Sequence, residues 1–234
     1  RSRSETKETD EASLDEQRYA NDSFSKSTQT IHQITVESKK NGQTAKSKSL
    51  KQTKRNEINN SFKNDHTSNK KVTVVAGDSI LKNIHGWRLS NPNNHVVVKR
   101  FAGATTSDME DFLKPVIRKE PNTIILHVGT NDVEHHTAER VAEGVLNLAT
   151  QVTQDSPSTE VVISAILPRT DKPNLMTKVK EANRIMYSFC VANNWSFIDH
   201  NSINPTCLNT RGLHLNRKGT SIVAKNISSY INTN

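Results

Sequence analysis

The sequence of 234 residues lacks several features that would assign it directly to a class of protein. It has no run of about 18 apolar residues, so it predicts no membrane-spanning helix. The opening residues Arg1-Ser2-Arg3-Ser4 are not followed by an apolar stretch, so they do not resemble a secretory signal. Two cysteines, Cys190 and Cys207, are too few for a disulfide framework or a zinc site. A reducing, intracellular location, cytoplasmic or nuclear, is therefore expected.

Apolar residues are also scarce, and most of the shortage lies in the first 70 residues. Hydrophobic residues make up 32% of the chain, and its mean hydropathy is −0.70. Residues 1–70 contain no proline, one glycine and only eight Leu, Ile, Val or Phe, together with 14 basic and 10 acidic residues. Such a segment cannot bury enough apolar surface to offset the entropy lost on ordering. Residues 1–70 are therefore predicted to be a disordered tail, and residues 71–234 a folded domain.

The tail contains a block of positive charge within a chain whose net charge is +8. Residues 39–55 hold seven Lys or Arg and no acidic residue. One interpretation is a solvated linker. The other is an electrostatic arm for non-specific RNA or DNA binding, or a nuclear-import patch. The sequence leaves both open.

From Lys71 onward, short apolar runs alternate with helical patterns. Five runs predict buried strands, at residues 72–76, 96–99, 123–128, 161–167 and 196–198. Ser107 with Glu110 predicts a capping-box helix start, and Thr137 predicts another helix cap. Two further amphipathic patterns fill residues 179–189 and 222–231. Strands alternating with helices indicate a parallel five-stranded sheet covered on both faces, which is a three-layer α/β/α fold.

Polar residues gather where the predicted strands end. The first strand is followed by Gly77-Asp78-Ser79, the second by a segment containing Gly103, and the third by Gly129-Thr130-Asn131-Asp132. His214 precedes the last predicted helix. Each motif alone is weak, since a Gly-Asp-Ser turn is common. Open parallel sheets bind ligands beyond the carboxyl ends of their strands, so together these motifs predict one site.

These motifs resemble those of the SGNH hydrolases, the GDSL-like esterase and lipase superfamily, over most of residues 72–231. The resemblance rests on Val74-Val75-Ala76-Gly77-Asp78-Ser79, Gly103, His127-Val128-Gly129-Thr130-Asn131-Asp132 and Leu213-His214-Leu215-Asn216. It implies a flavodoxin-like fold, which agrees with the pattern of strands and helices. The longer strings around Gly103 and His214 are similar to a branch associated with metazoan non-LTR retrotransposon open reading frames.

The resemblance implies acyl transfer, with no cofactor and no metal. Ser79 would be the nucleophile and His214 its base, because a serine hydroxyl reacts only when a base takes its proton. The oxyanion would be held by the backbone N–H groups of Ser79 and Gly103 and by the side chain of Asn131. Glycine lets the backbone approach a ligand closely, and an asparagine amide donates hydrogen bonds without carrying charge.

One position departs from the family pattern. The family usually has an aspartate three residues before the histidine, and this chain has Arg211 there. An arginine cannot accept a hydrogen bond, and its charge opposes formation of an imidazolium. Three outcomes are open: a backbone carbonyl orients His214 in a Ser–His dyad, Asp199 supplies the acid from the loop after the fifth strand, or catalysis is lost.

Two functions from different classes follow. The first is a serine esterase acting on small acyl or acetyl esters through a dyad or an incomplete triad. The alternative is a catalytically weakened module of the same fold, within a retroelement-type protein, that binds nucleic acid through residues 39–55. The sequence leaves the ester and the oligomeric state open.

Overall fold

The computed structural model describes residues 70–233, and the elements within this range form an α/β domain. The predicted disordered tail, with its basic block at residues 39–55, lies outside the described residues except for Lys70. In chain order the elements are β1 (Lys71–Gly77), η1 (Ser79–Asn83, a 3₁₀ helix), α2 (Gly86–Leu89), β2 (Asn94–Arg100), α3 (Thr106–Ile117), β3 (Thr123–His127), η2 (Asp132–Glu134, 3₁₀), α4 (Ala138–Asp155), β4 (Glu160–Ser164), α5 (Leu175–Asn193), β5 (Ser196–Ile198), η3 (Pro205–Cys207, 3₁₀) and α6 (Arg217–Thr233).

The five strands form one parallel sheet in the order β2-β1-β3-β4-β5. Each predicted strand is found: the fifth has the predicted bounds, and the bounds of the other four shift by one to three residues. Gly77 at the end of β1 pairs with Arg100 on one side and with His127 on the other. The carboxyl ends of the three strands β2, β1 and β3 therefore finish at the same edge, where the predicted site residues follow them.

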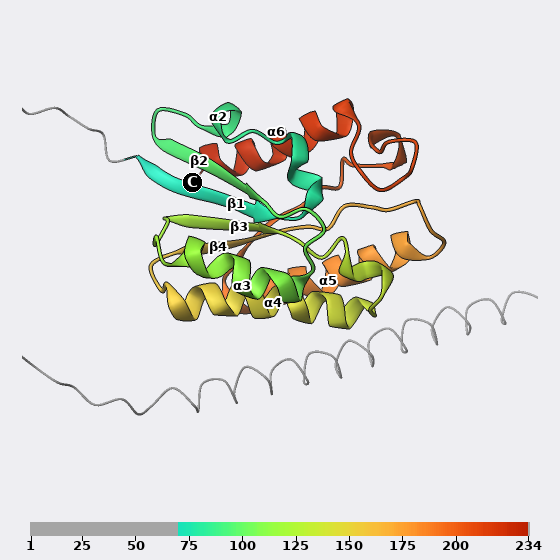
Figure 1. Ribbon diagram of the computed structural model, residues 1–234, viewed down its shortest axis with the longest axis horizontal. Helices are drawn as coiled ribbons and strands as arrows, with labels where there is room; N and C mark the ends of the chain where they lie inside the picture. Colours follow the sequence, from blue (N-terminus) through green and yellow to red (C-terminus); the bar gives the residue numbers. More distant parts are fainter. Residues whose placement is uncertain (1–69, 234) are drawn as a thin grey trace, which may run out of the picture. The chain divides into compact units, whose positions relative to one another are not determined.

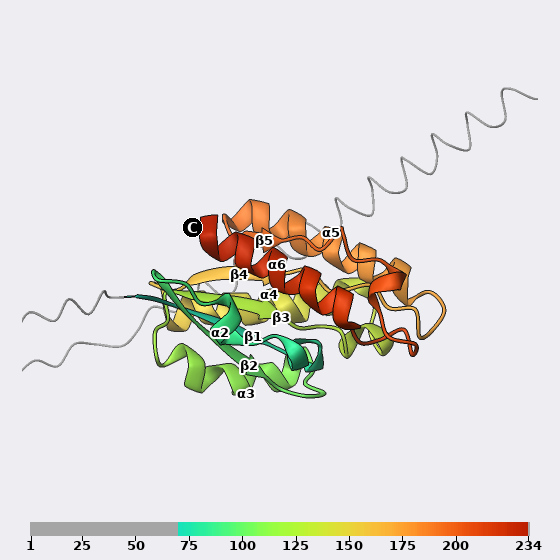
Figure 2. The same ribbon diagram turned by 90° about the horizontal axis from the view of Figure 1, so that it is seen from above.

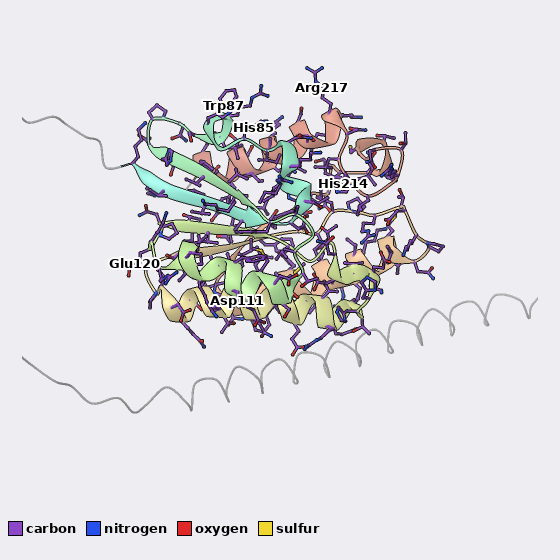
Figure 3. The ribbon with its side chains drawn as sticks, in the orientation of Figure 1. His85, Trp87, Asp111, Glu120, His214 and Arg217 are labelled. Carbon is purple, nitrogen blue, oxygen red and sulfur yellow. The ribbon has the colours of Figure 1, made fainter. Side chains whose placement is uncertain are left out.

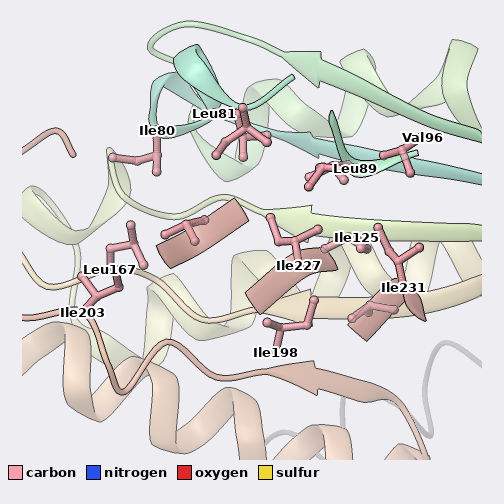
Figure 4. Close-up of a cluster of buried hydrophobic side chains, with 14 of the residues drawn as sticks. Ile80, Leu81, Leu89, Val96, Ile125, Leu167, Ile198, Ile203, Ile227 and Ile231 are labelled. Carbon is pink, nitrogen blue, oxygen red and sulfur yellow. The ribbon is translucent and has the colours of Figure 1, made fainter. Parts of the chain in front are cut away.

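Helices cover both faces of the sheet, which confirms the predicted three-layer fold. Helices α3, α4 and α5 lie on one face, and α2 and α6 on the other (Figures 1 and 2). The core beneath α6 joins aliphatic side chains of the strands to those of the helix, including Val75, Ile125, Val162, Ile227 and Ile231 (Figure 4). β-branched residues suit buried strands because their stiff side chains pack well on a pleated surface.

Two predicted helix starts had different outcomes. Thr137 caps α4 as expected, since its side chain accepts a hydrogen bond from the Arg140 N–H. The capping box of α3 is two residues earlier than predicted. Thr105 and Asp108 form it, each side chain bonded to the other residue's backbone N–H. Within the described residues, no helix has both the length and the apolar character needed to cross a membrane.

Candidate active site

The turn after β1 presents Ser79 at the edge of the sheet. Asp78 caps η1, and its buried carboxylate accepts a hydrogen bond from the Ile80 N–H at 2.9 Å. A Cβ atom on Gly77 would lie 1.9 Å from the carbonyl oxygen of His127, so only glycine permits this approach of β1 to β3. Ser79 is the first residue of η1, where the backbone N–H has no partner within the helix.

The loop between η3 and α6 carries His214, and backbone contacts hold it. The His214 carbonyl accepts a hydrogen bond from the Asn209 N–H at 2.7 Å, and Leu208 and Leu215 form an antiparallel bridge. The side chain of Asn216 donates to the carbonyls of Thr206 and Leu208 at 2.8 and 2.9 Å. These contacts fix the backbone on both sides of the imidazole.

Gly212 fixes the other end of this loop against the segment that follows β4. Its φ of +71° is in the region that favours glycine, and a Cβ there would lie 2.4 Å from Thr170 Oγ1. The Gly212 carbonyl accepts a hydrogen bond from the Thr170 N–H at 2.9 Å. The position of His214 therefore depends on contacts from the segment that follows β4, which is far away in sequence.

Ser79 and His214 meet although 135 residues separate them. Ser79 Oγ lies 3.1 Å from His214 Nε2, which is hydrogen-bonding distance. Both side chains are partly buried. Figure 3 shows His214 close to the carboxyl ends of the strands. The geometry matches what transfer of a serine proton to an imidazole requires.

The two predicted oxyanion residues from the other loops border this edge. Gly103 is exposed, has a φ of +79° and has open space where a Cβ would lie. Asn131 donates one amide hydrogen to the Ala104 carbonyl at 2.8 Å, which leaves its second hydrogen available. This bond ties the loop after β3 to the loop after β2.

Asp132 strengthens the link between these loops. Its buried carboxylate accepts hydrogen bonds from the Thr106 N–H at 3.1 Å and from Thr106 Oγ1 at 2.8 Å. Asp132 thus has a structural role, holding the start of α3 next to Asn131.

Sequence reasoning missed a second clamp, Arg169. Only 4% of this residue is exposed, and its guanidinium donates to the Thr130 carbonyl at 2.7 Å. It also binds both carboxylate oxygens of Asp171. Arg169 therefore holds the backbone beside Asn131, with Asp171 compensating its buried charge. A single Arg after a predicted strand resembles a surface residue. Only the nearby acid at Asp171 could have indicated that Arg169 is buried and paired.

No acceptor for His214 Nδ1 is found among residues 70–233. The carboxylate of Asp199 accepts a hydrogen bond from Asn201, and no hydrogen bond joins it to His214. Arg211 is exposed and makes no hydrogen bond or ion pair with another described residue. Among the described residues, Ser79 and His214 therefore form a hydrogen-bonded pair without a third, acidic partner.

A buried hydrogen-bonded network runs under the site. The Asn226 amide donates to His200 Nδ1 at 3.0 Å, His200 Nε2 lies 2.8 Å from Ser164 Oγ, and Ser164 Oγ lies 2.9 Å from His127 Nδ1. With Asn226 as donor, one proton order satisfies all three contacts: His200 donates to Ser164, and Ser164 donates to His127. Both imidazoles are then neutral.

Burial explains the acid–base properties of these groups. Burial lowers the pKa of His127 to about 3 and that of His200 to about 4. The nearby His200 ring makes a further, smaller contribution to the lowered pKa of His127. Burial also raises the pKa of Asp78, the residue before Ser79, to about 6. His127 belongs to the edge that holds Ser79, because the His127 carbonyl accepts a hydrogen bond from the Asp78 N–H.

A groove of about 600 Å³ lies elsewhere, between β2 and α3, and does not include Ser79 or His214. Its walls are mainly apolar, from Val72, Val74, Val97, Phe101, Phe112 and Val116. Among the described residues, no group of three or more His, Cys, Asp or Glu is placed to hold a metal ion.

Similarity to known proteins agrees with this geometry. A model of the GDSL-like lipase/acylhydrolase family matches residues 74–222, more than half of the chain. A platelet-activating factor acetylhydrolase IB subunit beta homolog from Drosophila melanogaster is 44% identical over 63 residues, which are 27% of this chain and 26% of that protein. Platelet-activating factor acetylhydrolase IB subunit alpha1 from Rattus norvegicus is 28% identical over 137 residues, covering 55% of this chain and 58% of that protein.

The matched region is thus less than two thirds of either curated relative. Among solved structures, the native aryl esterase of M. smegmatis has a TM-score of 0.60 over 70% of this chain and 99% of that one, at 16% identity. That likeness shows the fold alone. The retrotransposon-associated branch stays a prediction. The family match begins within β1 and ends within α6, so it includes the Ser79 turn and the other loops described above, and the chain belongs to the GDSL-like lipase/acylhydrolase family.

Proposed function

We propose that this member of the GDSL-like lipase/acylhydrolase family is a serine carboxylesterase that hydrolyses small acyl or acetyl esters, with Ser79 as nucleophile and His214 as base. The 3.1 Å contact between Ser79 Oγ and His214 Nε2 carries the proposal. The two side chains are far apart in the sequence but adjacent in the fold, and a serine hydroxyl beside a half-buried imidazole is the arrangement that nucleophilic catalysis needs.

The reaction follows from these atoms. Ser79 Oγ attacks the ester carbonyl carbon while His214 Nε2 takes the hydroxyl proton. The carbonyl oxygen becomes an oxyanion, and the Ser79 N–H, the Gly103 N–H and the free amide hydrogen of Asn131 donate to it. His214 then gives the proton to the departing alcohol oxygen as the C–O bond breaks. Water, deprotonated by His214, then attacks the acyl-serine. His214 returns that proton to Ser79 Oγ as the bond from Oγ to the acyl carbon breaks, which releases the acid and the free serine.

The preference for a small acyl group has two supports. The relatives from Drosophila melanogaster and Rattus norvegicus are acetylhydrolases by name. The apolar groove between β2 and α3, which would suit a long alkyl chain, does not include the catalytic pair. An intracellular location stays a prediction.

The missing acceptor at His214 Nδ1 sets the expected level of activity. In a serine protease triad, disturbing the acid that orients the histidine lowers kcat by about 10⁴. Here the loop contacts of Asn216 and Gly212 hold the backbone of the base, but no carboxylate of residues 70–233 is placed to stabilise the imidazolium. We therefore expect turnover that is measurable but slow.

The test uses the full chain with p-nitrophenyl esters of increasing acyl length and a fluorophosphonate probe. We expect highest kcat/KM on the acetyl ester, and probe labelling that maps to Ser79. Ser79→Ala should abolish both, and Ser188→Ala, a serine on α5 away from the site, should change neither. Equal hydrolysis by Ser79→Ala and the unmodified chain would refute the proposal.

A further inference from the structure

Charged residues are distributed unevenly between the two faces of the domain. Residues 79–107 and residues 200–233 contain four Lys or Arg each and no Asp or Glu. The intervening residues 108–199 contain nine Lys or Arg and thirteen Asp or Glu. The two acid-free segments build η1, α2 and β2 and then η3 and α6. They supply both helices of one face, and α3, α4 and α5 on the other face carry the acidic residues (Figures 1 and 2).

The cations of the acid-free segments have no acidic partners in the described structure. No ion pair is found for a Lys or Arg of residues 79–107 or 200–233, whereas Lys and Arg of the intervening residues form ion pairs within residues 111–184. Lys99 turns toward the α3 side, where it lines the groove with Asp111 and Glu120. The other seven are exposed, and we call them the cationic face: Lys82, Arg88, Arg100, Arg211, Arg217, Lys218 and Lys225.

An exposed aromatic side chain, Trp87, lies next to Arg88, the cation of α2. Trp87 on α2 is 71% exposed. The Arg88 guanidinium lies 4.8 Å from the centre of the indole, and the His85 ring is stacked at 6.3 Å. Figure 3 shows His85, Trp87 and Arg217 on the same side of the domain. Even with both contacts, most of the indole surface remains open to a planar group.

The surroundings of Trp87 favour one kind of polyanion. A membrane-binding surface combines cations with several apolar side chains that enter the lipid. The other large apolar residues that are exposed in the described structure, Phe112, Tyr187 and Val191, lie on α3 and α5, away from the cationic face. One tryptophan among cations is instead what single-stranded nucleic acids use, since bases stack on aromatic rings while phosphates contact Lys and Arg.

We propose that the cationic face binds single-stranded nucleic acid, with a base stacked on Trp87 and phosphates contacted by the cations of α2 and α6. This site is on the folded domain and is separate from the basic block predicted at residues 39–55. It does not depend on catalysis. Recognition is independent of sequence, because an aromatic ring stacks on any base and contacts to phosphates carry no sequence information.

The experiment measures fluorescence anisotropy of a labelled oligouridylate, about 20 nucleotides long, with the full chain. A full-length background in which the seven Lys and Arg of residues 39–55 are replaced by Gln isolates the domain's contribution. In that background, Trp87→Ala should raise Kd by about tenfold, and Trp87→Phe should restore most of the affinity. Arg217→Gln/Lys218→Gln should reduce the slope of log K against log salt by about 1.4, since each phosphate contact to a single strand contributes about 0.7.

The matched control is Arg118→Gln/Lys119→Gln, which removes two adjacent exposed cations just beyond α3, and it should leave the slope unchanged. In a Trp195→Phe background, the oligonucleotide should quench the fluorescence of Trp87. Equal effects of the two double variants would overturn the proposal, because binding would then follow net charge alone. It would also be overturned if phosphatidylserine vesicles quenched Trp87 and the oligonucleotide did not, since the face would then bind membranes. Far-ultraviolet circular dichroism confirms that each variant is folded.

Discussion

The buried histidines beneath the site predict how stability depends on pH. His127 and His200 are neutral in the folded protein, with pKa values of about 3 and about 4 against an ordinary value of 6.5. The unfolded chain therefore binds protons at these rings at a higher pH than the folded chain does. Their contribution to the free energy of unfolding is complete above pH 6.5, and it falls as the pH drops toward their pKa values in the folded protein.

Asp78 acts in the opposite direction. Its folded pKa of about 6 lies above its ordinary value of 3.8, so the folded chain binds this proton first and gains stability as the pH falls through 6. Between about pH 7 and pH 5, linkage gives a loss of about 2 kcal/mol for each histidine and a gain of about 1 kcal/mol for Asp78. The two histidines dominate, and the free energy of unfolding should fall by roughly 2 to 3 kcal/mol.

Urea unfolding of the full chain, followed by circular dichroism at intervals between these pH values, measures the change. His200→Gln removes one of the two titrating rings, so it should roughly halve the histidine part of the pH dependence, whatever its effect on stability at neutral pH. Constant or rising stability on acidification would show that the rings are not held neutral. It would also refute the proton order assigned from Asn226 to His127.

Two further predictions concern the catalytic loops. Arg211→Asp should raise kcat/KM on a p-nitrophenyl ester by about tenfold, equivalent to ~1.4 kcal/mol of barrier, because a carboxylate three residues before His214 would accept a hydrogen bond from its Nδ1–H. An unchanged kcat/KM would show that the imidazole is already oriented. A lower kcat/KM would show that Arg211 has a role of its own. Asn131→Ala should lower kcat about 10²-fold with little change in KM, since an oxyanion donor acts mainly in the transition state, and an unchanged kcat would remove Asn131 from that role.

The fold was predictable because its signals are local. A strand buried on both faces requires a short run of β-branched residues, and residues 72–76 and 123–128 supply such runs directly. The turn at Gly77 was also predictable from the sequence, because the backbone there passes so close to β3 that only glycine fits. These constraints involve residues that are close together in the chain, so they can be recognised from a single sequence.

The supports of the site depend on distant partners, which no local pattern reveals. Arg169 supports the site only because its guanidinium reaches the Thr130 carbonyl, 39 residues away in the sequence. His127, Ser164 and His200 end or follow three different strands, and only the parallel register aligns them. The predicted helix start at Ser107 was wrong for a related reason. Two overlapping pairs of capping residues compete there, and the bond of Thr106 to Asp132 favours the earlier start.

The way in which His214 is held explains how a serine–histidine pair can persist here with Arg211 in the usual position of the acid. A triad aspartate has two effects: it fixes the orientation of the imidazole, and it stabilises the imidazolium. In this chain the Asn216 side chain, the Leu208–Leu215 bridge and the close contact of Gly212 with Thr170 fix the loop backbone. Backbone restraint replaces part of the first effect. It cannot replace the second, because no acceptor among the described residues faces Nδ1. The geometry of the pair and its catalytic power are therefore separable, which is why Arg211→Asp should change the rate while leaving the 3.1 Å contact of Ser79 with His214 in place.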